Sequence, residues 1–184
     1  MSYDIILLNG GSSSGKSTLV RELQRGLGEP WLSVGIDTFI STLPPRMTGE
    51  EDGIVVGEDG AIGIGEEFTR LEQCWMRGVA AMAAAGARIV VDDGFLSGPP
   101  AQRRWRAAVE GLSVLWVGVH CSPEEAERRE ALRGDRETGM ARLQALRVHE
   151  GIEYDLEVDT TGLEPAKVAL PILESVRRAA DFPL

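Results

Sequence analysis

Short continuous apolar runs alternate with longer amphipathic stretches along this chain. An apolar run bounded by glycine, proline or acidic residues is typical of a strand that is buried on both faces. The pattern predicts four such strands and a weaker fifth one. They are expected at residues 4–9, 32–36, 87–93, 113–121 and 155–161.

Helical periodicity fills the intervals between these strands. Glu29-Pro30 ends the first predicted helix, Gly86 is placed to cap the third, and Pro123 suits the first turn of another. Because strands alternate with helices, the sequence predicts βαβ units and an α/β fold with a parallel sheet. Helices are expected at about 17–27, from Thr38, at about 66–85, near 99–110, from Pro123, after an arginine-rich bend, and from near Glu164.

Residues 44–65 are the least regular part of the chain. Pro44-Pro45 breaks regular structure, and two short β-like runs flank Glu58-Asp59-Gly60, which predicts a hairpin. We expect this segment to be an insertion that lines or covers a site. The length of 184 residues and the absence of repeats or linkers predict one domain over 1–184, with this insertion and a lid region at about 128–147.

Composition restricts the partners of the chain. The formal net charge of −10 argues against nucleic acid, because an acidic surface repels phosphate backbones. No apolar stretch is long enough to span a membrane, and the start has no basic region of a signal peptide, so we expect a cytoplasmic protein. Cys74 and Cys121 are expected to be reduced, buried thiols, and His120 and His149 to be structural.

The charge is uneven along the chain. The segment from Arg128 to Arg147 carries +3, so the remainder must carry −13. A cationic segment of this kind suits a compact anionic ligand such as a nucleotide. Arg133 and Arg136 flank a glycine that permits a bend, and arginines on a mobile cover can close over a triphosphate. For Arg128, Arg142 and Arg147, ordinary glutamate–arginine pairs on a solvated helix are the favoured interpretation.

Residues 10–17 fit the pattern G-x-x-x-x-G-K-[ST] between a predicted strand and a predicted helix. Glycines let the backbone turn so that several N–H groups point at phosphate oxygens, and the helix that follows adds the positive end of its dipole. Lys16 would reach the β- and γ-phosphates, and the Ser17 hydroxyl would ligate Mg²⁺. The residues expected to bind the nucleotide are Gly10, Gly11, Ser12, Ser13, Ser14, Gly15, Lys16, Ser17 and Thr18, together with Arg133.

Acidic residues follow two of the predicted strands, where ligands bind in open α/β sheets. Asp37 comes after the second strand and is a candidate base for a hydroxyl acceptor, although it could equally cap a helix from Thr38. Asp92 and Asp93 end the third strand, and either could orient a water on Mg²⁺ or ligate the ion. We assign Asp92 with Ser17 to the metal and Asp93 to the acceptor pocket.

Large apolar side chains lie beside these acids in sequence, and a partly aromatic acceptor would use such groups. We place Trp31, Phe39 and Phe95 in the acceptor pocket, although core packing is the commoner fate of any one of them.

These features predict transfer of the γ-phosphoryl group of ATP to a hydroxyl group of a small molecule. A GTPase switch would need an Asn-Lys-x-Asp motif, but Asn9 is the only asparagine in the chain. A regulatory ATPase that transfers nothing, and a binding module without catalysis, remain as alternatives. The intact Lys16, Ser17 and acids disfavour the second of them.

Nearly the whole chain resembles the chloramphenicol phosphotransferases. The segments that carry the resemblance are IILLNGGSSSGKS, PWLSVGIDTFI, ARIVVDDGFLSG, VLWVGVHC, GDRETGMA and VHEGIEYDLEVDTT. The resemblance implies a three-layer fold like that of the nucleotide and shikimate kinases, with a five-stranded parallel sheet and an arginine-bearing lid. It also implies ATP and Mg²⁺ as cosubstrates, and transfer to the primary hydroxyl of chloramphenicol.

The resemblance further implies roles for individual residues. Asp37 aligns with the catalytic base of that family, and Arg133 and Arg136 with its lid arginines. Gly94 and residues 44–65 are expected to border the acceptor pocket. The acceptor could still be another antibiotic, a sugar nucleotide or a metabolite that carries a hydroxyl group.

Overall fold

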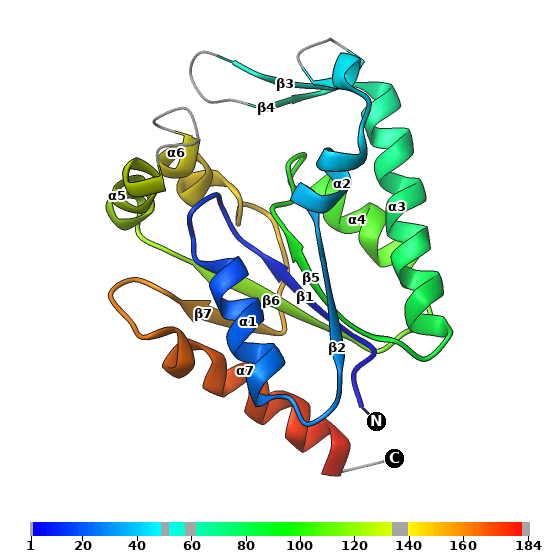
Figure 1. Ribbon diagram of the computed structural model, residues 1–184, viewed down its shortest axis with the longest axis vertical. Helices are drawn as coiled ribbons and strands as arrows, with labels where there is room; N and C mark the ends of the chain where they lie inside the picture. Colours follow the sequence, from blue (N-terminus) through cyan, green and yellow to red (C-terminus); the bar gives the residue numbers. More distant parts are fainter. Residues whose placement is uncertain (1, 49–51, 58–61, 134–139, 182–184) are drawn as a thin grey trace.

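The computed structural model describes residues 2–48, 52–57, 62–133 and 140–181. Five parallel strands form its central sheet in the order β2-β5-β1-β6-β7 (Figure 1), which confirms the predicted five-stranded α/β architecture. The strands are β1 (Ile5–Asn9), β2 (Trp31–Gly35), β5 (Arg88–Asp93), β6 (Val114–His120) and β7 (Leu156–Asp159).

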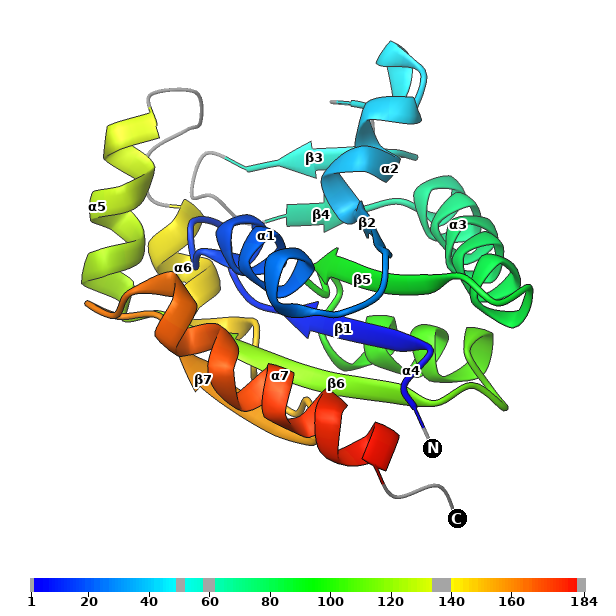
Figure 2. The same cartoon turned by 60° about the horizontal axis from the view of Figure 1, so that its bottom comes forward.

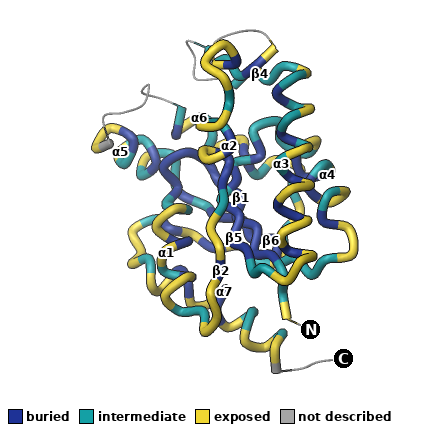
Figure 3. Tube along the Cα trace, turned by 45° about the vertical axis from the view of Figure 1, so that its right-hand side comes forward, coloured by how far each residue is buried: buried dark blue, intermediate teal, exposed yellow. Residues whose placement is uncertain are grey.

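Helices cover both faces of this sheet, which gives three layers (Figure 2). On one face lie α1 (Lys16–Gly26) and α7 (Pro165–Asp181), and on the other lie α3 (Glu66–Ala84) and α4 (Pro99–Ala108). Side chains alternate between the two faces of a strand, so Ile6 and Leu8 of β1 pack with α1 and α7, whereas Ile5 and Leu7 pack with α3 and α4. Strand β1 is buried along its whole length at the centre of the molecule (Figure 3).

The remaining described elements gather beyond the carboxyl ends of the strands. Two of the short ones form the predicted hairpin, in which Ile54 is paired with Ile64 in antiparallel register. Helix α2 begins at Ile36, two residues before the expected start. The elements are α2 (Ile36–Thr42), η1 (Pro45–Met47), β3 (Ile54–Val56), β4 (Ile62–Ile64), α5 (Pro123–Arg133) and α6 (Met140–Arg147).

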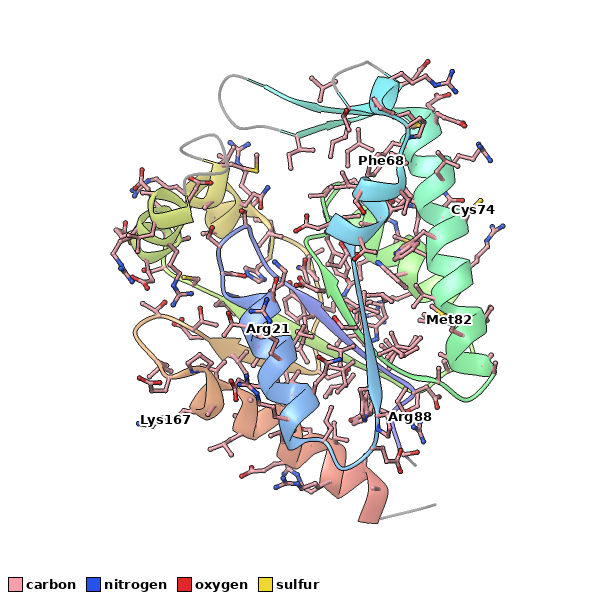
Figure 4. All side chains as sticks on the ribbon, in the orientation of Figure 1. Arg21, Phe68, Cys74, Met82, Arg88 and Lys167 are labelled. Carbon is pink, nitrogen blue, oxygen red and sulfur yellow. The ribbon has the colours of Figure 1, made fainter. Side chains whose placement is uncertain are left out.

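Packing at the two ends of the sheet is different in kind. At the amino ends of the strands, Arg88 binds the backbone oxygen of Tyr3 and the carboxylate of Asp4. At the carboxyl ends, Phe68 of α3 lies beside α2 (Figure 4) and is fully buried with Phe39.

Cys74, also on α3, is exposed rather than buried as the sequence led us to expect. Among the described helices, none combines the length and the hydropathy that crossing a lipid bilayer requires.

Leu8 provides a test of this arrangement, because it is fully buried between the sheet and α1. Replacing it by alanine, Leu8→Ala, should lower the free energy of unfolding by about 2–5 kcal/mol, through lost burial and the cavity left behind. Leu170→Ala on the half-exposed side of α7 is the matched control and should cost less than about 1 kcal/mol. Urea unfolding of both variants measures the difference, and equal losses would contradict the layer assignment.

Candidate active site

The loop between β1 and α1 turns its backbone through conformations that few side chains permit. Gly15 has φ of 93° and Ser13 has φ of 57°, both in the left-handed region. A Cβ atom on Gly10 would lie 2.5 Å from the backbone oxygen of Val119, so only glycine fits there. Helix α1 follows with no acidic side chain in its first turn, which leaves the positive end of its dipole facing the loop. The predicted phosphate loop thus has the backbone shape that binds anions.

Lys16 lies over this loop. Its ammonium group donates to the backbone oxygens of Gly10 at 2.7 Å and Gly11 at 2.9 Å, and its Nζ is 3.7 Å from Oδ1 of Asp92. The ammonium group is therefore anchored inside the loop, within reach of any phosphate that the loop binds.

Ser17 and Asp92 meet beside Lys16. The hydroxyl of Ser17, in the first turn of α1, donates to Oδ2 of Asp92 at 2.9 Å. A hydroxyl and a carboxylate are hard oxygen donors of the kind Mg²⁺ takes, and this ion completes its shell with water and substrate phosphates. The two residues fit the metal role that we assigned to them from the sequence.

Asp93 has a different surrounding from Asp92, because successive side chains of a strand point to opposite faces. It is buried, and the indole N–H of Trp105 donates to its Oδ2 at 2.6 Å. The backbone N–H groups of Gly94 and Phe95 donate to its Oδ1, and burial raises the pKa of the carboxyl group. The assignment of Asp93 to the acceptor pocket is therefore wrong: this carboxyl group holds the turn after β5.

Asp37 lies on the same side of the sheet as the phosphate loop. It sits in the first turn of α2 and lines a cavity of about 530 Å³ that is also lined by residues 10 and 12–17 of the loop and by Asp92. Gly35 is the N-cap of α2 and Asp37 lies inside the helix, so the alternative that Asp37 caps a helix from Thr38 is wrong.

The rest of the cavity wall is mainly apolar. The irregular segment contributes to it through Thr48, Ile54 and Ile62, and Gly94 also lines it, which confirms that both border this cavity. Among the described residues of the wall, Lys16 is the only basic one. The lining residues outside the loop are Ile36, Asp37, Ile40, Thr48, Ile54, Ile62, Asp92, Gly94, Leu96, Met140 and Gln144.

The three aromatic residues placed in the pocket from sequence do not line this cavity. Trp31 is the first residue of β2 and packs in the core against α1. It lies about 13 Å along the strand from the end that faces the site. Phe39 turns away from the cavity on α2, and its ring packs edge-on against Phe68 at 5.2 Å. Phe95 is also buried, but it lines an adjoining cavity of about 290 Å³.

The arginine segment is only partly described. Arg133 is the last residue of α5 and its side chain is not described, and Arg136 lies outside the described residues. Arg128 pairs with Glu125 at 2.8 Å and Arg142 with Glu127 at 3.2 Å, as expected for a solvated helix.

Arg129 was missed as a site residue, because its spacing from Glu125 predicts an ordinary helix pair. That pair is present at 2.8 Å, and hydrogen bonds from Arg128 and Arg129 lower the pKa of Glu125 to about 2. However, Arg129 also donates to the backbone oxygen of Thr160 at 2.8 Å, and the hydroxyl of Thr160 donates to the loop oxygen of Ser14 at 2.7 Å. Arg129 therefore joins α5 to the phosphate loop.

A second cavity of about 370 Å³ lies on the other side of the loop from Asp37. Its wall combines loop atoms, apolar side chains and two arginines that are ion-paired with Glu125, and the guanidinium and apolar surfaces suit a flat heterocycle. The lining residues are Ser13, Gly15, Thr18, Leu19, Glu125, Arg128, Arg129, Thr160, Leu163, Pro165 and Val168.

A buried polar network lies behind the loop. Asn9, the last residue of β1, donates to the backbone oxygen of Val148 at 3.1 Å and to the hydroxyl of Tyr154. His149 forms a 2.7 Å hydrogen bond with the same hydroxyl, and its ring stacks on that of His120. Burial, together with the nearby His120, lowers the pKa of His149 to about 4. The contacts of His149 with Tyr154 and His120 are compatible with the structural role expected for both histidines.

The fold and this site together define a class of protein. A parallel sheet carries a phosphate loop after its first strand, an Mg²⁺-type acid on the adjacent strand, and a further carboxylate across the cavity. This arrangement is that of the P-loop kinases.

Comparison with known proteins identifies the family. Residues 3–177 match the family model described as chloramphenicol phosphotransferase-like protein, and the chain belongs to this family. Two Mycobacterium tuberculosis proteins, from strains CDC 1551 and H37Rv, are each 33% identical over 98% of this chain and 84% of their own length. Both carry the name "Putative O-phosphotransferase".

Solved structures of kinases share the fold. The adenosine phosphosulfate (APS) kinase of Mycobacterium tuberculosis, solved with AMPPNP and APS, has a TM-score of 0.61 at 16% identity and covers 96% of this chain and 98% of its own. Shikimate kinase from Acinetobacter baumannii, solved with shikimate, has a TM-score of 0.60 at 15% identity, covering 96% and 94%. The chain is thus an enzyme, a P-loop small-molecule O-phosphotransferase.

The network behind the loop generates a prediction about pH. Because the pKa of His149 is lowered from 6.5 to about 4, the unfolded chain takes up a proton between these values that the folded protein does not. The contribution of neutral His149 to stability is complete above pH 6.5 and is lost as the pH falls toward 4. His149→Asn removes this titration and should flatten the stability profile in that window.

Urea unfolding of both proteins between pH 7 and pH 4 gives the measurement. The neighbouring side chains of His120, Glu157 and Lys16 are present in both proteins, so the difference between the two curves reports on the removal of His149. Parallel curves over this range would contradict the lowered pKa.

Proposed function

We propose that this enzyme transfers the γ-phosphoryl group of ATP, with Mg²⁺, to the primary hydroxyl of chloramphenicol and so inactivates the drug. The observation that carries the proposal is the shared cavity: Asp37 and the phosphate loop face one space whose other walls are mainly apolar. Membership of the chloramphenicol phosphotransferase-like family supports the same acceptor.

The proposed nucleotide position follows from the two cavities that flank the loop. The adenine ring would occupy the second cavity between Arg129 and Leu163, and the triphosphate would follow the loop toward Asp37. Lys16 would exchange its bonds to the oxygens of Gly10 and Gly11 for bonds to the β- and γ-phosphates. Ser17 and Asp92 would hold Mg²⁺, which neutralises charge on the phosphates.

The place of Asp37 in the wall of the shared cavity supports a role as the base. The acceptor oxygen would attack the γ-phosphorus, the bond from that phosphorus to the bridging oxygen of ADP would break, and the hydroxyl proton would pass to the Asp37 carboxylate. Arg133 and Arg136 would close over the triphosphate and stabilise the charge of the transferring group.

The walls of the cavity favour an uncharged acceptor. Chloramphenicol is neutral, carries an aromatic ring and exposes a primary hydroxyl. The side chains of Ile36, Ile54 and Leu96 offer apolar surface to such a ring. An acceptor with a carboxylate or phosphate group would find only Lys16 as a described basic partner in this wall, and Lys16 is engaged by the nucleotide.

Chloramphenicol itself provides the direct test. With ATP and Mg²⁺, the enzyme should release one ADP per chloramphenicol and form a phosphorylated drug. The analogue that lacks the primary hydroxyl should give no product, since no nucleophile remains at that position. Coupled ADP detection and mass spectrometry measure both. ATP hydrolysis that does not depend on an acceptor would favour a regulatory ATPase. If the enzyme phosphorylates another alcohol but not chloramphenicol, the kinase activity stands and the proposed acceptor is wrong.

Asp37→Asn tests the base. The amide cannot take the hydroxyl proton, so kcat should fall by about 10²- to 10⁴-fold, while the affinity for ATP stays near that of the wild type. Glu110→Gln is the control, because it makes the same chemical change at an exposed position where the chain enters the amino end of β6. Steady-state kinetics and ATP titration separate the two effects, and undiminished transfer by Asp37→Asn would remove Asp37 from the mechanism.

A further inference from the structure

Helix α6 packs directly on the phosphate loop. A Cβ atom on Gly11 would lie 3.1 Å from Cβ of Gln144 and 3.2 Å from the backbone nitrogen of Ala145, so the missing side chain of Gly11 is what lets the helix approach. The side-chain oxygen of Gln144 accepts a hydrogen bond from the backbone N–H of Ser12 at 2.6 Å. The side chain of Gln144 thus occupies one backbone N–H group of the phosphate loop, that of Ser12.

The position of Ser12 tells which phosphate this donor faces. Ser12 and Gln144 line the cavity that contains Asp37, and neither lines the second cavity, whereas Ser13 and Gly15 line both. A triphosphate that runs from the second cavity toward Asp37 therefore ends beside Ser12 and Gln144. The group at that end is the one that is transferred.

The chemistry of the Gln144 amide suits this location. Its carbonyl oxygen and a phosphate oxygen would compete for the one N–H of Ser12 and would repel each other. The same amide carries two N–H donors on Nε2, and rotation about its last side-chain bond exchanges oxygen and nitrogen. A donor facing the phosphoryl group would stabilise charge where the reaction develops it.

We propose that Gln144 binds the transferring phosphoryl group. Its carbonyl accepts from Ser12 in the arrangement described above, and its NH₂ group donates to the terminal phosphate when ATP occupies the loop. The inference rests on the proposed function, because it requires a triphosphate in the loop. It adds a residue that lies outside the loop motif and is carried by α6.

The face of α6 agrees with this role. Met140 and Gln144 lie one turn apart and both line the Asp37 cavity, and Gln144 and Arg147 both line the adjoining cavity. One side of α6 therefore faces the space above the loop. From this side, the side chain of Gln144 forms a hydrogen bond with the loop backbone.

The experiment compares AMPPNP and ADP, which differ in the terminal group. Binding of each with Mg²⁺ is measured by isothermal titration calorimetry without an acceptor. Gln144→Ala should weaken AMPPNP binding by about tenfold or more, the size expected for a hydrogen bond to a charged group, and leave ADP binding within about twofold. Gln144→Glu should weaken AMPPNP binding further, because a carboxylate cannot donate to the phosphate and repels it.

Gln73→Glu is the matched control, since it adds the same charge on α3, away from the loop, and should change neither affinity. Tighter binding of both nucleotides by Gln144→Ala would overturn the inference, because the side chain would then only compete for Ser12. Equal weakening of both nucleotides would also overturn it, because the contact would then only hold α6 in place.

The calorimetry also separates this inference from the proposed acceptor. A wild-type enzyme that binds neither nucleotide would overturn both. If the wild type binds AMPPNP and Gln144→Ala loses only that affinity, while chloramphenicol is not phosphorylated, the assignment of Gln144 stands and the acceptor is wrong.

Discussion

The site depends on how the carbonyl groups of the phosphate loop are bound. Those of Gly10 and Gly11 accept from Lys16, and that of Ser14 accepts from the hydroxyl of Thr160 at the end of β7. Because side chains hold these oxygens, the peptide units are oriented with N–H groups toward the space where phosphate would bind. Thr160 is held in turn by Arg129, so α5 and the edge strand fix the shape of a loop that the central strand carries.

Strand geometry divides two adjacent acids between two roles. Asp92 meets Ser17 and Lys16 on one side of β5, whereas Asp93 points into the opposite core and binds Trp105 and the following turn. The buried carboxyl group positions Phe95, whose φ of 35° is unusual for a residue with a side chain. Gly94 and Leu96 in this turn line the cavity that contains Asp37, so the buried carboxyl group of Asp93 shapes the wall of the space that Asp92 also lines.

The sequence predicts much of this arrangement, because some of its signals depend on the backbone alone. The phosphate loop and the succession of strands and helices along the chain follow from local pattern. The place of Asp37 follows from the rule that the carboxyl ends of parallel strands meet at one edge of the sheet. The direction of Trp31 and Phe39 does not, because it depends on which face of each element meets a neighbour. Gln144 belongs to no motif, and its contact with Ser12 exists only because α6 lies across Gly11.

The cavity proposed for the acceptor shows where selectivity could change without loss of phosphoryl transfer. The sheet and the helices on its two faces belong to the fold that is shared with kinases at 15–16% identity. The apolar walls, in contrast, come from α2, the hairpin β3–β4 and α6, which lie beyond the sheet and do not carry its core. Substitutions at Ile54 or Ile62 can therefore reshape the acceptor space while Lys16, Ser17 and Asp92 keep their geometry. Changes in residues 44–65 could therefore alter which alcohol the cavity accepts, while the sheet and the phosphate loop stay unchanged.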